Sequence, residues 1–192
     1  LEGPLLLHVV TEKGRGCGFA SREPTRYHGV GGYSLPDGTL PPPVPGFSAA
    51  FGRALCSLAE KHPEVIAVSA AMLPGTGLEE FARRFPERCY DVGIAEEHAA
   101  VFASGLALAG RRPVCALYST FMQRALDCVF HDAALGNVPV IFALDRAGAV
   151  ADGPTHHGIY DPGFLRALPN LTVMAPATEA ELAAMLDLAY SL

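Results

Sequence analysis

The sequence is poor in charge and has no run of basic residues. Only 18% of its 192 residues are charged, and the formal net charge is −6. A protein that follows a nucleic-acid backbone needs clustered Lys and Arg, so nucleic-acid binding is disfavoured. No apolar stretch approaches the roughly 20 residues needed to span a bilayer, so we expect no membrane partner. The first residues, Leu1-Glu2-Gly3-Pro4, also lack the charged and apolar regions of a signal peptide.

Cysteine occurs five times but never in a C-x-x-C pair. Cys17, Cys56, Cys89, Cys115 and Cys128 are odd in number and widely spaced, which argues against a disulfide framework and against metal ligation. Cys115 and Cys128 lie in apolar segments and are most simply small core residues. We therefore expect a reduced, cytoplasmic chain that holds no metal by itself.

Several common site motifs are missing too. The sequence has no G-x-x-x-x-G-K-[ST] phosphate loop and no G-x-G-x-x-G opening a helix. It also lacks the G-x-S-x-G elbow of the α/β-hydrolases. Neither nucleotide binding through these loops nor Ser-His-Asp hydrolysis is indicated.

Apolar residues, by contrast, make up half of the chain, which is enough for a substantial core. From residue 47, short runs of Val, Ile, Ala and Leu alternate with helical patterns. This alternation predicts an α/β fold with a parallel sheet covered by helices on both faces. We expect helices near residues 47–62, 78–85, 95–109, 120–135, 163–168 and 178–190, and strands near residues 65–69, 89–92, 113–118, 138–144 and 171–174.

The region before residue 47 has a different character. Residues 5–10 predict a buried strand, whereas residues 12–46 are rich in Gly and Pro and lack periodicity. A loop of this length inside one compact domain would be unusual, so we predict a connector between two domains. The predicted organisation is a domain end at 1–11, a connector at 12–46 and a second domain at 47–192. Because the chain enters on a strand without sheet partners and stops within a helix, we expect a segment of a larger protein, with its second domain truncated at the C-terminal end.

Polar and aromatic side chains gather in the loops that follow the predicted strands. The carboxyl ends of parallel strands meet at one edge of a sheet, where open α/β folds bind their ligands. Glu96 is placed there as the acid that opens an Ala-rich helix. The candidate residues at this edge are Glu96, Tyr118, Phe121, Arg124, Arg146, Asp152, His156 and His157.

Each candidate also has a purely structural interpretation. Glu96 could be an ordinary acid in the first turn of a helix, where the macrodipole favours it. Arg124 could pair with Asp127 or Asp132 on its own helix, and Arg146 could cap a strand end. An aromatic residue at a helix start is commonly part of a core, and a loop histidine is commonly solvated.

Six stretches, taken together, resemble the 1-deoxy-D-xylulose-5-phosphate synthases, which are thiamine-diphosphate enzymes of the transketolase group. The stretches are HVVTEKGRG (8–16), YHGV (27–30), DVGIAEEHA (91–99), YSTFMQRA (118–125), DRAG (145–148) and DGPTHHG (152–158). They run in order over nearly the whole chain. The most specific pair is Y-S-T-F-x-Q-R followed by D-R-A-G.

The resemblance implies a pyrimidine-binding domain over most of the chain, preceded by the end of a diphosphate-binding domain. It also implies roles for residues that contact the thiamine diphosphate cofactor. Glu96 matches the glutamate that contacts N1′ of the aminopyrimidine ring and starts catalysis, and Phe121 matches the aromatic residue that stacks on that ring. Lys13 is matched to a cofactor-binding position, and His28 and His156 to catalytic histidines.

The implied reaction condenses pyruvate with D-glyceraldehyde 3-phosphate and releases carbon dioxide, in the synthesis of isoprenoid, thiamine and pyridoxal precursors. The implied assembly is a homodimer. The residues matched to the substrate pocket are Tyr118, Arg124, Arg146, Asp152 and His156.

The sequence departs from the family pattern in three places. Glu97 stands where the family often has glutamine, and the loop between Arg146 and Asp152 is one residue shorter. The G-D-G…N segment that binds magnesium and the cofactor's diphosphate is missing, so we expect the Mg²⁺ ligands outside this chain and no activity from the chain alone. The alternatives are another transketolase-group enzyme, or a non-catalytic dimerisation or interaction module.

Overall fold

The structure is a computed structural model that describes residues 3–29, 31–42, 44 and 46–192. The chain divides into two compact units, Leu1–Val44 and Pro45–Leu192. Residues 1–2 of the predicted domain end lie outside the described residues, as do residues 30, 43 and 45 of the predicted connector.

The first unit is organised around three aromatic rings. Its one helix among the described residues is α1 (Gly18–Arg22). Phe19 on this helix lies 5.1 Å from the Tyr27 ring and 5.3 Å from the Tyr33 ring, measured between centroids. The Tyr27 hydroxyl donates to the Gly38 carbonyl at 2.6 Å, which closes the loop that follows.

The prediction of a strand at residues 5–10 is wrong. These residues form neither a helix nor a strand, and Leu6 and Val10 are 92% and 83% exposed. A strand is stable only when a neighbour takes its backbone hydrogen bonds, and no described residue pairs with this segment.

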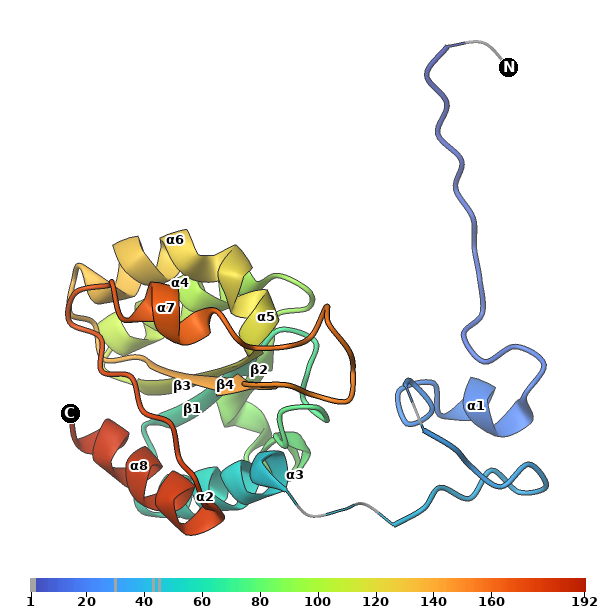
Figure 1. Cartoon of the computed structure of the whole chain (residues 1–192), viewed down its shortest axis with the longest axis horizontal. Coiled ribbons are helices and arrows are strands. Elements are labelled where there is room, and N and C mark those ends of the chain that lie inside the picture. Colours follow the sequence, from blue (N-terminus) through green and yellow to red (C-terminus); the bar gives the residue numbers. More distant parts are fainter. Residues whose placement is uncertain (1–2, 30, 43, 45) are drawn as a thin grey trace. The chain divides into compact units, whose positions relative to one another are not determined.

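The second unit contains a four-stranded parallel sheet in the order β2-β1-β3-β4, which confirms the predicted fold class (Figure 1). The strands are β1 (Val65–Ser69), β2 (Cys89–Asp91), β3 (Arg112–Tyr118) and β4 (Ile141–Asp145). The longer helices are α2 (Phe47–Lys61), α3 (Glu79–Arg84), α4 (Glu96–Leu108) and α8 (Glu179–Ser191). The central strands β1 and β3 read as continuous apolar runs because both of their faces are covered.

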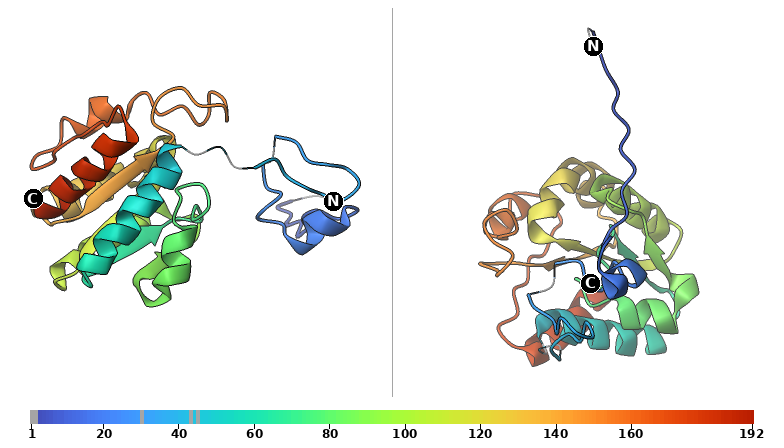
Figure 2. Two further views of the ribbon diagram at one scale, coloured as in Figure 1. Left: turned by 90° about the horizontal axis from the view of Figure 1, so that it is seen from below. Right: turned by 90° about the vertical axis from the view of Figure 1, so that its right-hand side faces the viewer.

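Each face of the sheet carries its own hydrophobic core. On one face, α2, α3 and α8 bury Leu55, Phe81 and Leu186 against the strands. Helices α2 and α8 lie side by side there, as the left view of Figure 2 shows. On the other face, Ala99 and Ala103 let α4 approach the sheet closely, and the short helix α7 (Asp161–Leu165) completes that layer.

The helix predicted at residues 120–135 is interrupted. Its residues form α5 (Ser119–Met122), a 3₁₀ turn (Gln123–Ala125), α6 (Leu126–Cys128) and a π-helical turn (Val129–Ala134). Such departures from α geometry are frequent near functional sites. Here α5 and the 3₁₀ turn follow β3 directly and carry two of the candidate residues, Phe121 and Arg124.

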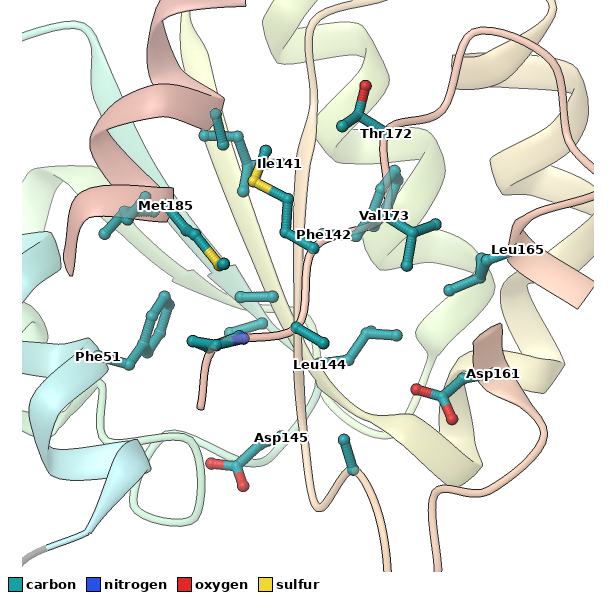
Figure 3. A pocket seen from close by; sticks show the side chains of 18 of the residues that line it. Phe51, Ile141, Phe142, Leu144, Asp145, Asp161, Leu165, Thr172, Val173 and Met185 are labelled. Atoms are coloured by element: carbon teal, nitrogen blue, oxygen red, sulfur yellow. The ribbon is translucent and has the colours of Figure 1, made fainter. Parts of the chain in front are cut away.

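The strand predicted at residues 171–174 is also wrong. These residues do not pair with β4, although both segments line one open groove of about 1020 Å³. The backbone of 171–174 therefore lacks the neighbour that would make it a strand. Figure 3 shows the groove: most of its labelled side chains are apolar, and the carboxylates of Asp145 and Asp161 lie below most of them in this view. The labelled apolar residues are Phe51, Ile141, Phe142, Leu144, Leu165, Val173 and Met185.

Candidate active site

Glu96 lies at the carboxyl edge of the sheet, as the sequence predicts. Strand β2 ends at Asp91, whose Oδ1 accepts from the backbone N–H groups of Ala71 and Gly93 at 2.7 and 2.9 Å. Gly93 turns the chain with a φ of +76°, a conformation that favours glycine, and α4 begins at Glu96. The result is a carboxylate in the first turn of a helix with only 1% of the residue exposed.

The buried carboxylate has a charged partner. Arg124 Nη1 donates to Glu96 Oε1 at 2.7 Å, and the arginine side chain is 48% exposed. The sequence left open a pairing of Arg124 with Asp127 or Asp132, but the structure pairs it with Glu96. A buried charge without a partner would be very costly, so this contact makes the burial of Glu96 tolerable.

Three aromatic rings, those of Phe121, Tyr118 and His156, lie next to the Glu96–Arg124 pair. The Arg124 guanidinium carbon lies 4.6 Å from the centroid of the Phe121 ring. Phe121 stacks with Tyr118 at 5.8 Å and 19°, and His156 meets Phe121 edge-on at 5.4 Å. A flat, half-buried aromatic face therefore lies next to the buried acid.

Arg146, at the end of β4, lies beside Tyr118 and extends this row of side chains that begins at Glu96. Its guanidinium carbon lies 4.7 Å from the centroid of the Tyr118 ring, and its Nε donates to Asp152 Oδ2 at 2.8 Å. Nη1 donates to Asp145 Oδ1 at 3.2 Å. Arg146 has a φ of +60°, an uncommon conformation for a residue with a side chain, and such backbone outliers cluster at functional sites.

Tyr118 and Arg146 affect each other's ionisation. Burial raises the pKa of Tyr118, and the positive charge of Arg146 only partly opposes that rise. Burial alone would lower the pKa of Arg146, but Tyr118, Asp145 and Asp152 together raise it. The pair therefore stays a neutral phenol beside a cation at neutral pH.

The loop that carries His156 is fixed by polar contacts. Thr120 Oγ1 donates to the Thr155 carbonyl at 3.1 Å, which ties the loop to α5. His157 Nδ1 accepts from the Val150 N–H at 3.1 Å, so this second histidine serves the loop's own structure. His156 is left to face the aromatic rings.

Sequence reasoning missed several supporting residues. A Cβ atom at Gly75 would lie 1.9 Å from the Tyr118 hydroxyl, and one at Gly158 would lie 2.3 Å from Ser119 Oγ. Ser48 Oγ donates to Asp145 Oδ2 at 2.5 Å, across 97 residues of sequence. Gly75 follows a proline in the loop after β1, but no sequence signal predicts its contact with Tyr118.

The two candidates of the first unit contact each other. Lys13 Nζ lies 2.5 Å from His28 Nδ1, and both side chains are exposed. The other seven predicted site residues belong to the second unit, where they form the continuous row from Glu96 to Asp152. Within the described part of the chain, no group of three or more His, Cys, Asp or Glu residues is arranged to hold a metal ion, and no helix combines the length and apolarity needed to cross a membrane.

Comparison with known proteins identifies the second unit. Residues 45–192 match the family model described as the pyrimidine-binding domain of transketolase. The chain belongs to this family. Among solved structures, this transketolase pyrimidine-binding domain is similar to a split-gene transketolase described as an inactive β4 tetramer, at 30% identity and a TM-score of 0.68 over 76% of this chain and 47% of that one. It also matches the fold of transketolase from Leishmania mexicana, at 24% identity and a TM-score of 0.70 over 78% of this chain and 24% of that one.

Among curated proteins, the chain is similar to enzymes named 1-deoxy-D-xylulose-5-phosphate synthase. It is 54% identical to the one from Syntrophotalea carbinolica over 95% of this chain and 29% of that protein. It is 52% identical to the one from Aquifex aeolicus over the whole chain and 30% of that protein. The chain therefore spans about three-tenths of the length of these relatives.

Proposed function

We propose that this chain is part of a 1-deoxy-D-xylulose-5-phosphate synthase, a thiamine-diphosphate-dependent transferase acting on pyruvate and D-glyceraldehyde 3-phosphate. The observation that carries the proposal is the buried Glu96–Arg124 pair beside the Phe121 ring, at the carboxyl edge of the sheet. Identities of 50–54% to synthases of that name support the choice of reaction.

The residues at this edge suit an aminopyrimidine ring. Such a ring has a flat π face and ring nitrogens on its rim. Phe121 offers a stacking surface, and Glu96 offers a carboxylate oxygen for a rim nitrogen. In this proposal Glu96 holds the proton shared with N1′, and burial excludes water from that contact. When bound, thiamine diphosphate supplies the electron sink that decarboxylation of pyruvate requires.

The other end of the row suits the phosphate of the aldehyde substrate. Arg146 presents a planar guanidinium fork, which matches phosphate oxygens in a bidentate manner. Tyr118 stands beside it as a neutral phenol that can donate a hydrogen bond. His156 lies between the two ends, edge-on to the Phe121 and Tyr118 rings, and in this proposal its imidazole transfers a proton. Asp152 holds Arg146 by an ion pair.

Three further assignments follow from the family resemblance. We propose that Lys13 contacts the cofactor and that His28 is a catalytic histidine. We also propose that the Mg²⁺ ligands lie outside this chain.

We also propose a cytoplasmic homodimer. Val101 and Leu108 lie seven residues apart on α4 and are 43% and 76% exposed, so they form an apolar stripe on one face of the helix. A second copy of the chain would cover such a stripe, and a relative described as a β4 tetramer also self-associates. Five free cysteines suit a reducing compartment.

The test uses the full-length protein with pyruvate, D-glyceraldehyde 3-phosphate, thiamine diphosphate and magnesium. We expect carbon dioxide and 1-deoxy-D-xylulose 5-phosphate as products. Glu96→Gln keeps the shape of the side chain but removes its charge, and we expect the rate to fall roughly 100-fold or more. Glu97→Gln is the matched control, because Glu97 is exposed and adjacent, and its rate should stay near that of wild type.

Other outcomes would favour other functions. If the protein binds the cofactor but forms no product from these two substrates, another transketolase-group enzyme becomes the better assignment. If it does not bind the cofactor, a non-catalytic dimerisation or interaction module does.

A further inference from the structure

We propose that Arg124 is a positioning residue for Glu96. The inference rests on the proposed function, because it takes Glu96 as the acid that meets the cofactor. It goes beyond the substrate-pocket role that the family resemblance implies for Arg124. The Glu96–Arg124 contact itself carries the inference.

The geometry commits the two carboxylate oxygens of Glu96 to different tasks. Oε1 accepts from Arg124 at 2.7 Å, and the described residues include no hydrogen-bond donor to Oε2. The side chain of Glu96 is 2% exposed, so its orientation is set by protein contacts and not by water. Arg124 thus holds one oxygen and leaves the other for a ligand.

The same guanidinium orients the stacking face. Its carbon lies 4.6 Å from the centroid of Phe121, within the range of a favourable cation–π contact. Arg124 therefore joins the start of α4, which carries the acid, to α5, which carries the ring. One side chain holds both contacts that an aminopyrimidine would make.

Loss of the contact would be costly, because the Glu96 carboxylate would remain buried without a partner. Only Nη1 of the Arg124 guanidinium makes this contact. One nitrogen is therefore enough to hold the buried acid in place.

The experiment is a double-mutant cycle in the full-length protein, read out as the dissociation constant of thiamine diphosphate with magnesium by calorimetry. Arg124→Met keeps the bulk of the side chain but removes its charge. We expect this change to weaken cofactor binding roughly tenfold or more, the loss expected for one charge-assisted hydrogen bond. In the Glu96→Gln background the same change should cost less than about threefold, because a neutral amide needs no counter-charge. Arg124→Lys should restore part of the affinity, since an ammonium group can still pair with Glu96.

A second readout does not need the cofactor. Without ligand, Arg124→Met should lower the unfolding midpoint when Glu96 is present and leave it nearly unchanged in Glu96→Gln. Arg111→Met is the control, because Arg111 is exposed and the described residues include no ion pair to it. Failure of the proposed function would appear separately, as a wild-type protein that does not bind the cofactor but still shows this coupling.

Two results would overturn the inference. One is an equal effect of Arg124→Met in both backgrounds, which would mean that the arginine acts independently of Glu96. The other is an unchanged cofactor dissociation constant together with a raised KM for D-glyceraldehyde 3-phosphate, which would make Arg124 a substrate ligand.

Discussion

At Gly75 the missing side chain makes room for the Tyr118 hydroxyl. A Cβ atom there would lie 1.9 Å from that oxygen and 2.8 Å from Cζ. Gly75→Ala should therefore displace the Tyr118 ring from Arg146 and lower the free energy of unfolding by about 1–3 kcal/mol, as overpacking does. We expect KM for D-glyceraldehyde 3-phosphate to rise roughly tenfold, measured by steady-state kinetics of the full-length protein.

The control for this substitution is Gly163→Ala on α7. A Cβ atom at Gly163 would meet no atom within 4 Å. Alanine suits a helix better than glycine, so stability should stay level or rise by about 0.5–1 kcal/mol. If Gly75→Ala behaves like Gly163→Ala, the close approach of Tyr118 to the loop after β1 affects neither stability nor substrate binding.

Single residues differ in how far the sequence reveals them. Glu96, Phe121 and Arg124 were predictable as a group, because each follows a strand whose carboxyl end meets the same sheet edge. The pairing of Glu96 with Arg124 was not predictable. Asp127 and Asp132 are closer to Arg124 in the sequence and were expected on the same helix. The positive φ of Arg146 carries no sequence signal either, because it arises from the loop that folds back onto Gly158.

At the scale of an element, the burial of β3 sets the ionisation of Cys115. Burial raises the pKa of this thiol to about 12, from an ordinary value of 9.0. Between these two values the unfolded chain loses the proton and the folded chain keeps it. The free energy of unfolding should therefore fall as pH rises above about 9, by up to about 1.4 kcal/mol for each pH unit.

Cys115→Ala isolates this contribution. The substitution should cost a roughly constant amount below pH 9 and become less unfavourable as pH rises, because alanine has no proton to lose. Urea denaturation at pH 8, 9.5 and 10.5 measures the difference from wild type at each pH. A difference that stays constant over this range would contradict a buried, neutral thiol. Cys17→Ala, in the first unit, is the control with a partly exposed thiol.

The elements themselves show where sequence patterns succeed and fail. The strands β1 and β3 were predictable because a continuous apolar run of this length has to be buried on two faces. Residues 5–10 and 171–174 have the same kind of pattern but form no strand. An apolar pattern fixes the need for burial, whereas a strand also requires a neighbour for its backbone, and that depends on distant parts of the chain.

At the scale of the whole molecule, the candidate residues provide only some of the groups that the proposed reaction needs. It provides an acid, a stacking ring and an arginine fork, but the sequence lacks the G-D-G…N segment that holds magnesium and diphosphate. The chain spans 29% and 30% of two synthases that it resembles, so we infer that the rest of the machinery belongs to other parts of the protein.

The 192-residue chain alone should therefore catalyse no carboligation. With pyruvate, D-glyceraldehyde 3-phosphate, thiamine diphosphate and magnesium supplied, we expect no 1-deoxy-D-xylulose 5-phosphate above background. The aminopyrimidine contacts alone leave the diphosphate unbound, so calorimetry should also detect cofactor binding far weaker than in the full-length protein. Circular dichroism would first establish that the chain is folded, so that inactivity cannot be ascribed to unfolding. Turnover by the folded chain would mean that its own residues complete the site, and the expectation of Mg²⁺ ligands elsewhere would then be wrong.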